Sequence, residues 1–240
     1  MKPDVRDLLY EIYQKKIEPV CFWTLYEESY TENRILTVNI EILKELLRDR
    51  SALRVANFCT IDSIVVAFAI RAAFGEKVSR LTGREIVEKS SKKIDARSIC
   101  MFGASEESRT LAKAKLQKLG ATSGQILVEV EPVSLKSTPL YGDGKPLACY
   151  FAYGFPKQEE KIDVFRGLNS GCGAILIGVG GAVDYFSGAV RPPPKLIADI
   201  GFEWLWRVFQ QPRSRIRRVV GVAPFAVRVI VCGVMARKWC

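Results

Sequence analysis

Residues 148–165 read ACYFAYGFPKQEEKIDVF and residues 173–181 read GAILIGVGG, and these two stretches decide the fold. Each opens with a short run of apolar residues, many of them branched or aromatic, which is typical of a strand buried on both faces. The charged stretch between the two runs has the character of a helix. A strand, a helix and a second strand form a βαβ unit, in which the two strands are parallel.

The same alternation extends toward the amino terminus. Strands are predicted at residues 34–39, 53–58, 97–102, 126–130, 147–153 and 174–179, with helical stretches between most of them. The sequence therefore predicts an α/β fold with a mostly parallel, Rossmann-like sheet that carries helices on both faces. Residues 131–146, which are rich in Pro and Gly, are expected to form a long loop.

Ligands of parallel sheets bind at the carboxyl ends of the strands. Several predicted strand ends should therefore surround one crevice. The loops concerned lie near Asn39, Thr60–Asp62, Gly103, Gly154–Gln158 and Gly180–Asp184.

Composition narrows the possible chemistry. The 240 residues are 48% hydrophobic, which is enough for a substantial core. The amino-terminal stretch MKPDVRDLLYEIYQKK is charged and helical in period, so no signal peptide is expected. Seven scattered cysteines without a C-x-x-C pair favour reduced thiols. There is no histidine, so catalysis would rest on carboxylates, hydroxyls, amides and arginines.

Positive charge is concentrated in the tail. The formal net charge is +10, and residues 191–240 hold ten Lys and Arg against two acids. A basic, apolar tail suits an anionic membrane surface or an anionic substrate group. Nucleic acid is disfavoured as a partner because the tail lacks a known reader motif. We divide the chain into an α/β core at 1–190 and a basic, amphipathic helical appendage at 191–240.

The appendage contains two predicted helical segments. Three prolines at 192–194 indicate a helix start, Pro212 indicates its end, and a new segment follows. Residues 219–236 are apolar except for Arg228. Pro224 and Arg228 count against a spanning helix, and the length lies at the lower limit for crossing a bilayer. A helix that lies in the membrane interface is therefore favoured.

Three signatures occur in series. They are a strand followed by a G-x-P-K-Q-E turn at 154–159, a strand followed by Gly-Gly and an aromatic-acidic patch at 180–186, and the Trp-rich stretch IGFEWLWRVFQQP at 200–212 followed by Arg. In this order and spacing the chain resembles the WecG/TagA/CpsF glycosyltransferases, bacterial enzymes of surface-polysaccharide synthesis. The resemblance extends back to about Arg34 and is almost absent from residues 1–30.

The resemblance implies a reaction and a location. A sugar would move from a UDP-sugar donor to a polyprenyl-diphosphate-linked sugar acceptor at the cytoplasmic face of the bacterial membrane, to which the enzyme binds peripherally. A single displacement would invert the anomeric carbon, and no metal or organic cofactor is implied. The family uses UDP-N-acetylmannosamine, UDP-glucose or other donors in teichoic acid, exopolysaccharide or capsule synthesis, and these residues do not discriminate among them.

Asp62 is the candidate general base. It follows a predicted strand and precedes an apolar helical segment, so on sequence alone it is also a good helix N-cap. In the family that the chain resembles, the Asp at this place is the proposed base that removes the acceptor proton. The family usually has Asp-Gly here, whereas this chain has Asp62-Ser63. Thr37 and Asn39 match the family's strand-end Thr-x-Asn, where the side chains face a sugar; a strand residue and a helix cap are the structural alternatives.

Binding residues are implied in the turns after the last two strands. Gln158 would hydrogen-bond the donor, in a turn shaped by Gly154. Gly180 and Gly181 would let the backbone approach a nucleotide, although a tight turn explains them almost as well. Asp184 and the aromatic residues after it could hold a ribose and a nucleobase, and the core is the alternative place for the aromatics. Glu159 is expected to be a solvated charge at a helix start.

Arginines are expected to neutralise the leaving diphosphate, because the chain has no Asp-x-Asp motif for a metal. The candidates are Arg80 and the tail residues Arg213 and Arg217, since a guanidinium binds phosphate oxygens in pairs. A solvated basic face is the alternative for the tail. Where many relatives have a Gly-Gly loop, this chain has Gly103-Ala104, which weakens a nucleotide-binding role for that loop.

Two further possibilities stay open. The alternative function is a catalytically weak, lipid-binding scaffold of a polysaccharide assembly complex. An apolar surface with a detachable tail would also suit a homo-oligomer whose assembly is linked to the membrane.

Overall fold

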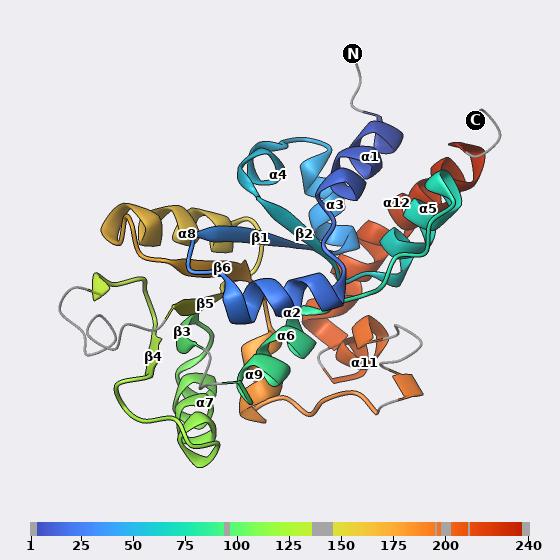
Figure 1. The fold of residues 1–240 in the computed structure, drawn as a ribbon. Coiled ribbons are helices and arrows are strands. Elements are labelled where there is room, and N and C mark those ends of the chain that lie inside the picture. The colour runs from blue at the N-terminus through green and yellow to red at the C-terminus, as the bar shows by residue number, and fades with distance from the viewer. Residues whose placement is uncertain are drawn as a thin grey trace.

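A six-stranded sheet forms the centre of the molecule (Figure 1). The computed structural model describes residues 4–93, 97–135, 146–194, 196–197, 203–210 and 212–236. The strand order is β2-β1-β6-β5-β3-β4, and each neighbouring pair is parallel. The strands are β1 (Asn33–Val38), β2 (Phe58–Ile61), β3 (Ser98–Gly103), β4 (Ile126–Glu129), β5 (Leu147–Ala152) and β6 (Ala174–Gly178). The predicted α/β fold with a parallel sheet is confirmed.

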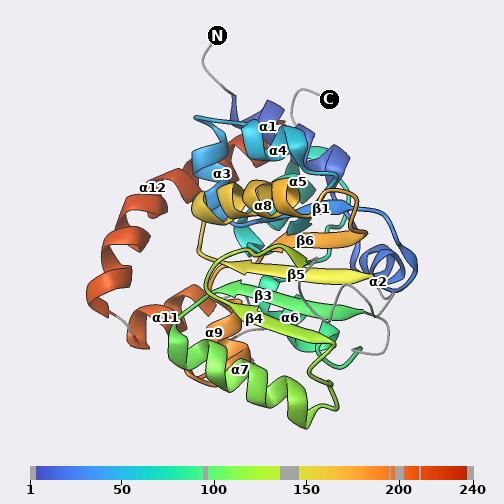
Figure 2. The ribbon, with the colours of Figure 1, turned by 90° about the vertical axis from the view of Figure 1, so that its left-hand side faces the viewer.

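Helices cover both faces of the sheet (Figures 1 and 2). One face packs against α2, α6, α7 and α9, and the other against α8 and, near β1 and β2, against α1, α3, α4 and α5. The described helices are α1 (Val5–Lys15), α2 (Pro19–Glu28), α3 (Ile40–Leu46), α4 (Ser51–Val55), α5 (Ile64–Phe74), α6 (Gly83–Ser90), α7 (Glu106–Lys118), α8 (Lys157–Leu168), α9 (Ala182–Ser187), α11 (Glu203–Gln210) and α12 (Pro212–Ala236).

The strands are apolar on both sides because both sides are covered. In β5, Tyr150 belongs to the cluster under α2 and α6, whereas the next residue, Phe151, belongs to the cluster under α8. The ring of Phe151 lies 5.3 Å from that of Phe102 and 5.8 Å from that of Phe165 on α8. This two-sided packing explains the continuous apolar runs in the sequence.

The predicted strand at 53–58 is wrong, because a short helix and the start of β2 occupy this stretch. Helix α4 begins at Ser51, whose N–H and hydroxyl both donate to the Asp49 carboxylate at 2.9 Å. At the other end, Lys15 Nζ donates to three backbone carbonyls at 2.6–3.1 Å, those of Leu53, Arg54 and Ala56. These bonds satisfy backbone groups that a helix end leaves unpaired, so the helical turn is stable here.

The tail forms the long helix α12, which runs beside α5 (Figure 1). As predicted, a new segment begins at Pro212, and the helix then continues through Pro224. Val229 is fully buried against the core. Gly233 lies so close to α5 that a Cβ there would be 2.7 Å from the Ala69 carbonyl oxygen. One side of α12 therefore packs tightly on α5.

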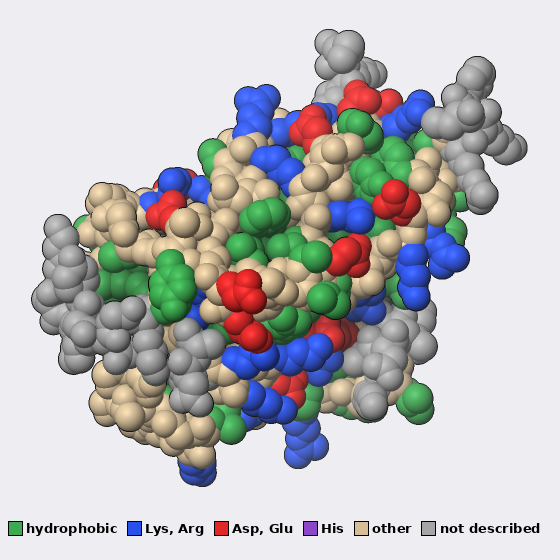
Figure 3. Space-filling view, viewed as in Figure 1, with side chains coloured by type: hydrophobic (Ala, Val, Ile, Leu, Met, Phe, Trp, Pro, Cys, Tyr) green, Lys and Arg blue, Asp and Glu red, His purple; other side chains and the backbone are tan. Residues whose placement is uncertain are grey.

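Other predictions for the tail have a mixed outcome. Helix α11 confirms a helix before Pro212, whereas residues 198–202 of the predicted helix lie outside the described residues. Residues 219–236 are the one stretch of the described chain that is long and apolar enough to cross a membrane. Acidic and basic side chains are interspersed over the face of the molecule in Figure 3.

Candidate active site at the carboxyl edge of the sheet

The strand order gathers the predicted site residues along one edge of the sheet. The chain passes from β1 to β2 at one side of the sheet and from β3 to β4 at the other, and β6 and β5 lie between these pairs. The loops after β2, β1, β6 and β5 are therefore neighbours in that order. They carry Asp62, Asn39, the Gly180–Gly181 pair and Gln158. In Figure 2 the strands' carboxyl ends lie on the side that carries α11 and the first half of α12.

Asp62 is fixed through its backbone beside the end of β1. Its N–H donates to the Val38 carbonyl at 2.9 Å, and its own carbonyl accepts from Arg80 Nε at 2.9 Å. Ser63 occupies the N-cap position of α5, so Asp62 is not the N-cap that the sequence offered as its alternative role. The structure thus brings together Asp62 and Arg80, two of the predicted site residues.

Thr37 and Asn39 flank Val38 and therefore lie next to Asp62. Thr37 is 4% exposed, and its Oγ1 lies 3.3 Å from the Oγ1 of Thr60. The sequence predicted Thr60 in the loop after a strand, but Thr60 lies inside β2. The Oδ1 of Asn39 accepts from the Ile42 N–H at 2.9 Å and caps α3. The cap predicted as the alternative for Asn39 is confirmed, and it orients the Asn39 amide at the strand end.

Gln158 is buried at the amino end of α8. It is 2% exposed and covers Gly178 so closely that any Cβ at position 178 would collide with the Gln158 amide. The Gln158 Nε2 donates to Glu159 Oε1 at 3.3 Å. Gly154 opens the turn with a φ of +79°, a left-handed conformation that favours glycine, and the Phe155–Pro156 peptide is cis. The turn and Gly178 together hold Gln158 in place.

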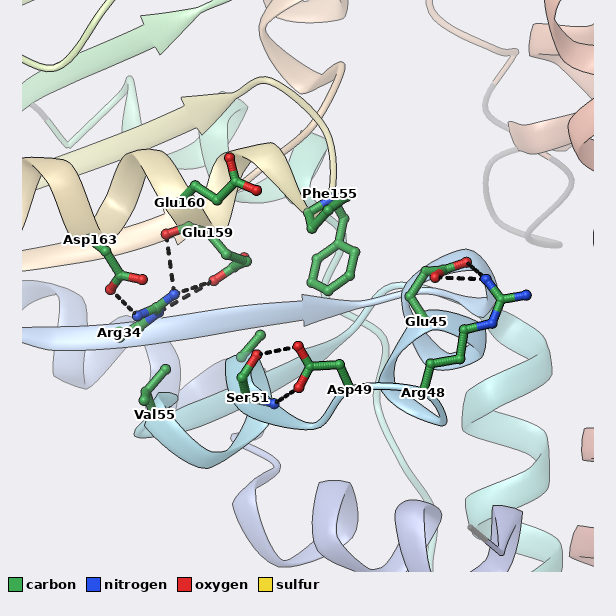
Figure 4. A pocket seen from close by; sticks show the side chains of 12 residues that line it. Arg34, Glu45, Arg48, Asp49, Ser51, Val55, Phe155, Glu159, Glu160 and Asp163 are labelled. Carbon is green, nitrogen blue, oxygen red and sulfur yellow. Dashed lines mark hydrogen bonds and ion pairs between the residues drawn. The ribbon is translucent and has the colours of Figure 1, made fainter. Parts of the chain in front are cut away.

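Glu159 is not the solvated charge that the sequence predicted. It is 6% exposed, and its Oε2 accepts from Arg34 at 2.9 and 3.3 Å, while Arg34 also donates to Asp163 at 2.7 Å (Figure 4). Burial raises the pKa of the Glu159 carboxyl despite the Arg34 guanidinium beside it. The sequence could not show this ion pair, because its members are 125 residues apart.

A groove of about 350 Å³ lies over this ion pair, between α8 and the segment of α3 and α4 (Figure 4). None of the predicted site residues lines it. Two guanidiniums in its lining are outnumbered by five carboxylates, those of Glu45, Asp49, Glu159, Glu160 and Asp163. A diphosphate would be repelled there, so the groove is not the candidate site.

The Gly180–Gly181 loop connects β6 to α9. Gly180 has a φ of +52°, and Gly181 is the N-cap residue of α9. Asp184 lies in the first turn of α9, and its Oδ1 accepts from Ser108 Oγ at 2.8 Å. The aromatic pair Tyr185–Phe186 is buried, so the core position predicted as their alternative is confirmed.

The segment after Arg80 runs along the carboxyl edge of the sheet. The Leu81 N–H donates to the Ile61 carbonyl of β2 at 3.0 Å. Two residues later, Gly83 lies against the end of β6, where a Cβ on it would be 3.2 Å from the Val179 carbonyl oxygen. The chain from Arg80 to α6 therefore passes from the end of β2 to the end of β6 along the candidate site.

A family comparison identifies the chain. Residues 20–238 match the model of the glycosyl transferase WecG/TagA/CpsF family. The chain belongs to this family. It is also similar to the N-acetylglucosaminyldiphosphoundecaprenol N-acetyl-beta-D-mannosaminyltransferase of Bacillus subtilis (strain 168), with 27% identity over 221 residues that cover 85% of this chain and 83% of the relative. The resemblance predicted from the three signatures is confirmed, and the match extends further toward the amino terminus than predicted.

In this glycosyl transferase an ion pair joins the core to the tail. Arg84, in the first turn of α6, donates to Glu203 of α11 at 3.0 Å, and both side chains are only about 20% exposed. Helix α11 is also bound to the Arg191 carbonyl, by Trp206 Nε1 at 3.1 Å and by Gln210 Nε2 at 3.0 Å. Sequence reasoning missed Arg84, although it is the next arginine after Arg80 in SRLTGRE.

The tail arginines of the transferase belong to α12. Arg213 and Arg217 lie in its first turns, and their side chains lie outside the described residues. The part of α12 that carries them is on the side to which the strands' carboxyl ends point (Figure 2). A role in binding phosphate therefore stays a prediction for both.

Proposed function

We propose that this glycosyltransferase moves a sugar from a UDP-sugar to a polyprenyl-diphosphate-linked sugar in bacterial surface-polysaccharide synthesis. The observation that carries the proposal is the position of Asp62, which lies beside Arg80 and Asn39 at the ligand-binding edge of the sheet in a member of this family. The name of the Bacillus relative supports the acceptor class, because that protein acts on N-acetylglucosaminyldiphosphoundecaprenol.

The mechanism is a single displacement. The Asp62 carboxylate removes the proton of the acceptor hydroxyl while that oxygen bonds to the anomeric carbon of the donor. The bond from the anomeric carbon to the UDP oxygen breaks on the opposite side, and UDP leaves with the electron pair. The configuration at the anomeric carbon is therefore inverted. Arg80, Arg213 and Arg217 neutralise the charge of the departing diphosphate, because guanidinium groups bind phosphate oxygens in pairs and keep their positive charge. No cofactor takes part in this step.

The remaining residues bind and orient the two substrates. Asn39 binds a sugar hydroxyl beside the Gly180–Gly181 loop, where the nucleotide lies close to the backbone. Gln158 is buried and supports this loop from the other side, because it packs on Gly178 two residues before the loop. Thr37 forms the floor of the site, since its hydroxyl is buried against Thr60. Gly154 shapes the turn that presents Gln158. UDP-N-acetylmannosamine is the favoured donor because the Bacillus relative is named for this sugar, and UDP-glucose is the alternative.

The enzyme binds to the cytoplasmic face of the membrane through α12. The side opposite the α5 contact exposes Val220, Val227, Val231, Val234 and Met235, which follow one another at helical spacing. A helix that is bound to the protein on one side and apolar on the other suits an interfacial position. The arginines at its amino end suit anionic lipid headgroups. The same apolar side could also join two copies of the chain.

The proposal is tested by measuring UDP release from a panel of UDP-sugars, with and without a polyprenyl-diphosphate-linked N-acetylglucosamine. We expect acceptor-dependent release from one donor. Asp62→Asn should lower kcat by about 10²–10⁴-fold and leave the Kd for UDP within about twofold, because a general base acts in the transition state and contributes little to ground-state binding.

Other results would contradict the proposal. An equal loss of turnover and UDP binding in Asp62→Asn would assign Asp62 to substrate binding or to structure. A protein that binds lipid vesicles but releases no UDP from any donor would support the scaffold predicted as the alternative function.

A further inference from the structure

Asp184 is held by the buried hydroxyl of Ser108, a residue to which the sequence assigned no role. Its Oδ1 accepts from Ser108 Oγ at 2.8 Å, and Ser108 is 1% exposed. The Ser108 hydroxyl in turn lies 2.9 Å from Ser105 Oγ, which donates to it. Since an ionised carboxylate can only accept, the hydroxyl hydrogen of Ser108 is committed to Asp184.

Helix α7 contacts α9 at a second point. Lys115 Nζ donates to the Phe186 carbonyl at 2.7 Å and lies 4.6 Å from the centre of the Phe186 ring. Ser108 and Lys115 thus bind the two ends of α9 to a single helix. Because α7 follows β3 and α9 follows β6, these contacts fix the position of Asp184 across two strand ends.

The carboxylate of Asp184 keeps one oxygen for another partner. Within the described part of the chain, hydrogen bonds engage only its Oδ1. Asp184 is partly exposed, and it comes directly after the Gly180–Gly181 loop. An ionised carboxylate has no hydrogen to donate, so it binds a hydroxyl group only by accepting that group's hydrogen. A fixed carboxylate beside a Gly-Gly loop at a strand end is therefore suited to the hydroxyls of a ribose.

We propose that Ser108 is a positioning residue, which holds the Asp184 carboxylate so that Oδ2 binds the 2′-hydroxyl of the ribose in the uridine nucleotide. This inference rests on the proposed function, because it assumes that the donor is a UDP-sugar. Ser108 touches no substrate itself. It determines how strongly the site prefers a ribonucleotide over a deoxyribonucleotide.

The test is a titration of the full-length protein with UDP and with 2′-deoxy-UDP. The wild type should bind UDP about tenfold more tightly, since the deoxy ligand lacks one hydrogen bond to a charged group. Ser108→Ala should weaken UDP binding about tenfold and leave the affinity for 2′-deoxy-UDP nearly unchanged. In turnover, KM for the donor should rise with kcat little altered, because binding is lost equally from ground and transition states.

Ser90→Ala is the matched control. Ser90 is fully buried on α6; its hydroxyl donates to the Val87 carbonyl of its own helix at 3.2 Å and also lies within hydrogen-bonding reach of the Tyr26 and Tyr150 hydroxyls, away from the candidate site. This variant removes the same atom from an equally buried site and should keep the wild-type preference for UDP. A similar loss of preference in Ser90→Ala would show that Ser108 has no specific role.

Asp184→Asn tests the same inference without altering a buried residue. It should lose the preference for UDP, and adding Ser108→Ala to it should cause no further loss, because both changes act through one carboxylate. A wild type that prefers UDP, together with a Ser108→Ala or an Asp184→Asn variant that keeps the full preference, would overturn the inference and leave the proposed function standing. A wild type that binds no uridine nucleotide would overturn both.

Discussion

At the scale of one residue, Ala104 has a strained backbone. It is the one described residue other than glycine with a positive φ, at 62°. Its N–H lies 3.3 Å from the Ala152 carbonyl, and its own carbonyl accepts from Arg109 at 2.9 Å. These contacts hold the backbone in a left-handed conformation that costs an alanine about 1–2 kcal/mol. An alanine thus occupies a conformation that favours glycine.

Ala104→Gly should therefore stabilise the protein. Relief of the strained backbone exceeds the extra entropy of glycine in the unfolded chain, so we expect a gain of about 0.5–1 kcal/mol in the free energy of unfolding. Urea denaturation measures it. Ala114→Gly on the exposed side of α7 is the control, where the same change should destabilise the protein by about 1 kcal/mol. Equal destabilisation by both substitutions would show that Ala104 is not strained.

At the scale of the elements, β6 and α8 pack closely because Gly178 of β6 has no side chain. The Gln158 amide occupies the space that a Cβ would take. Gly178→Ala should displace Gln158 and lower kcat/KM by about 10–100-fold, because a small misplacement of a positioning group is costly in catalysis. Steady-state kinetics with the preferred donor measures the effect.

Gly167→Ala is the control for that prediction. Position 167 lies on α8, the helix that carries Gln158, and a Cβ there meets no atom within 4 Å. The variant should keep full activity and gain up to about 1 kcal/mol of stability, since alanine favours helix. Wild-type kinetics in Gly178→Ala would mean that the contact with Gln158 has no role in activity.

The sequence predicted the elements that a local pattern of apolar residues reveals. Five of the six strands were located by apolar runs that a doubly covered sheet requires. The failure at 53–58 came from Lys15, which closes α4 from a distant helix. The pairing of Asp184 with Ser108 in the candidate site, and that of Glu159 with Arg34 outside it, were missed for the same reason. Such partners meet only through the fold, and a single sequence carries no local signal for them.

At the scale of the whole molecule, the tail lies at the carboxyl edge of the sheet, where we propose that the substrates bind. Two contacts position it. The carboxyl half of α12 packs on α5, where Gly233 meets Ala69, and α11 is bound to the core by the pair Arg84–Glu203. The first contact is apolar and close, whereas the second lies beside the residues that connect β2 to β6. The ion pair therefore sets where the start of α12 lies relative to Asp62.

A charge exchange tests this coupling. Arg84→Glu and Glu203→Arg should each lower turnover several-fold, because each places two like charges together at partly buried positions and detaches α11. The double variant restores an ion pair and should recover most of the activity, with a coupling free energy of about 1 kcal/mol, a modest value because water still reaches both groups. The exposed pair of Glu45 on α3 and Arg48 just after that helix is the control, and its exchange should leave turnover unchanged. If the double variant were no more active than either single variant, the pair would not position the tail, and the packing of α12 on α5 would have to do so alone.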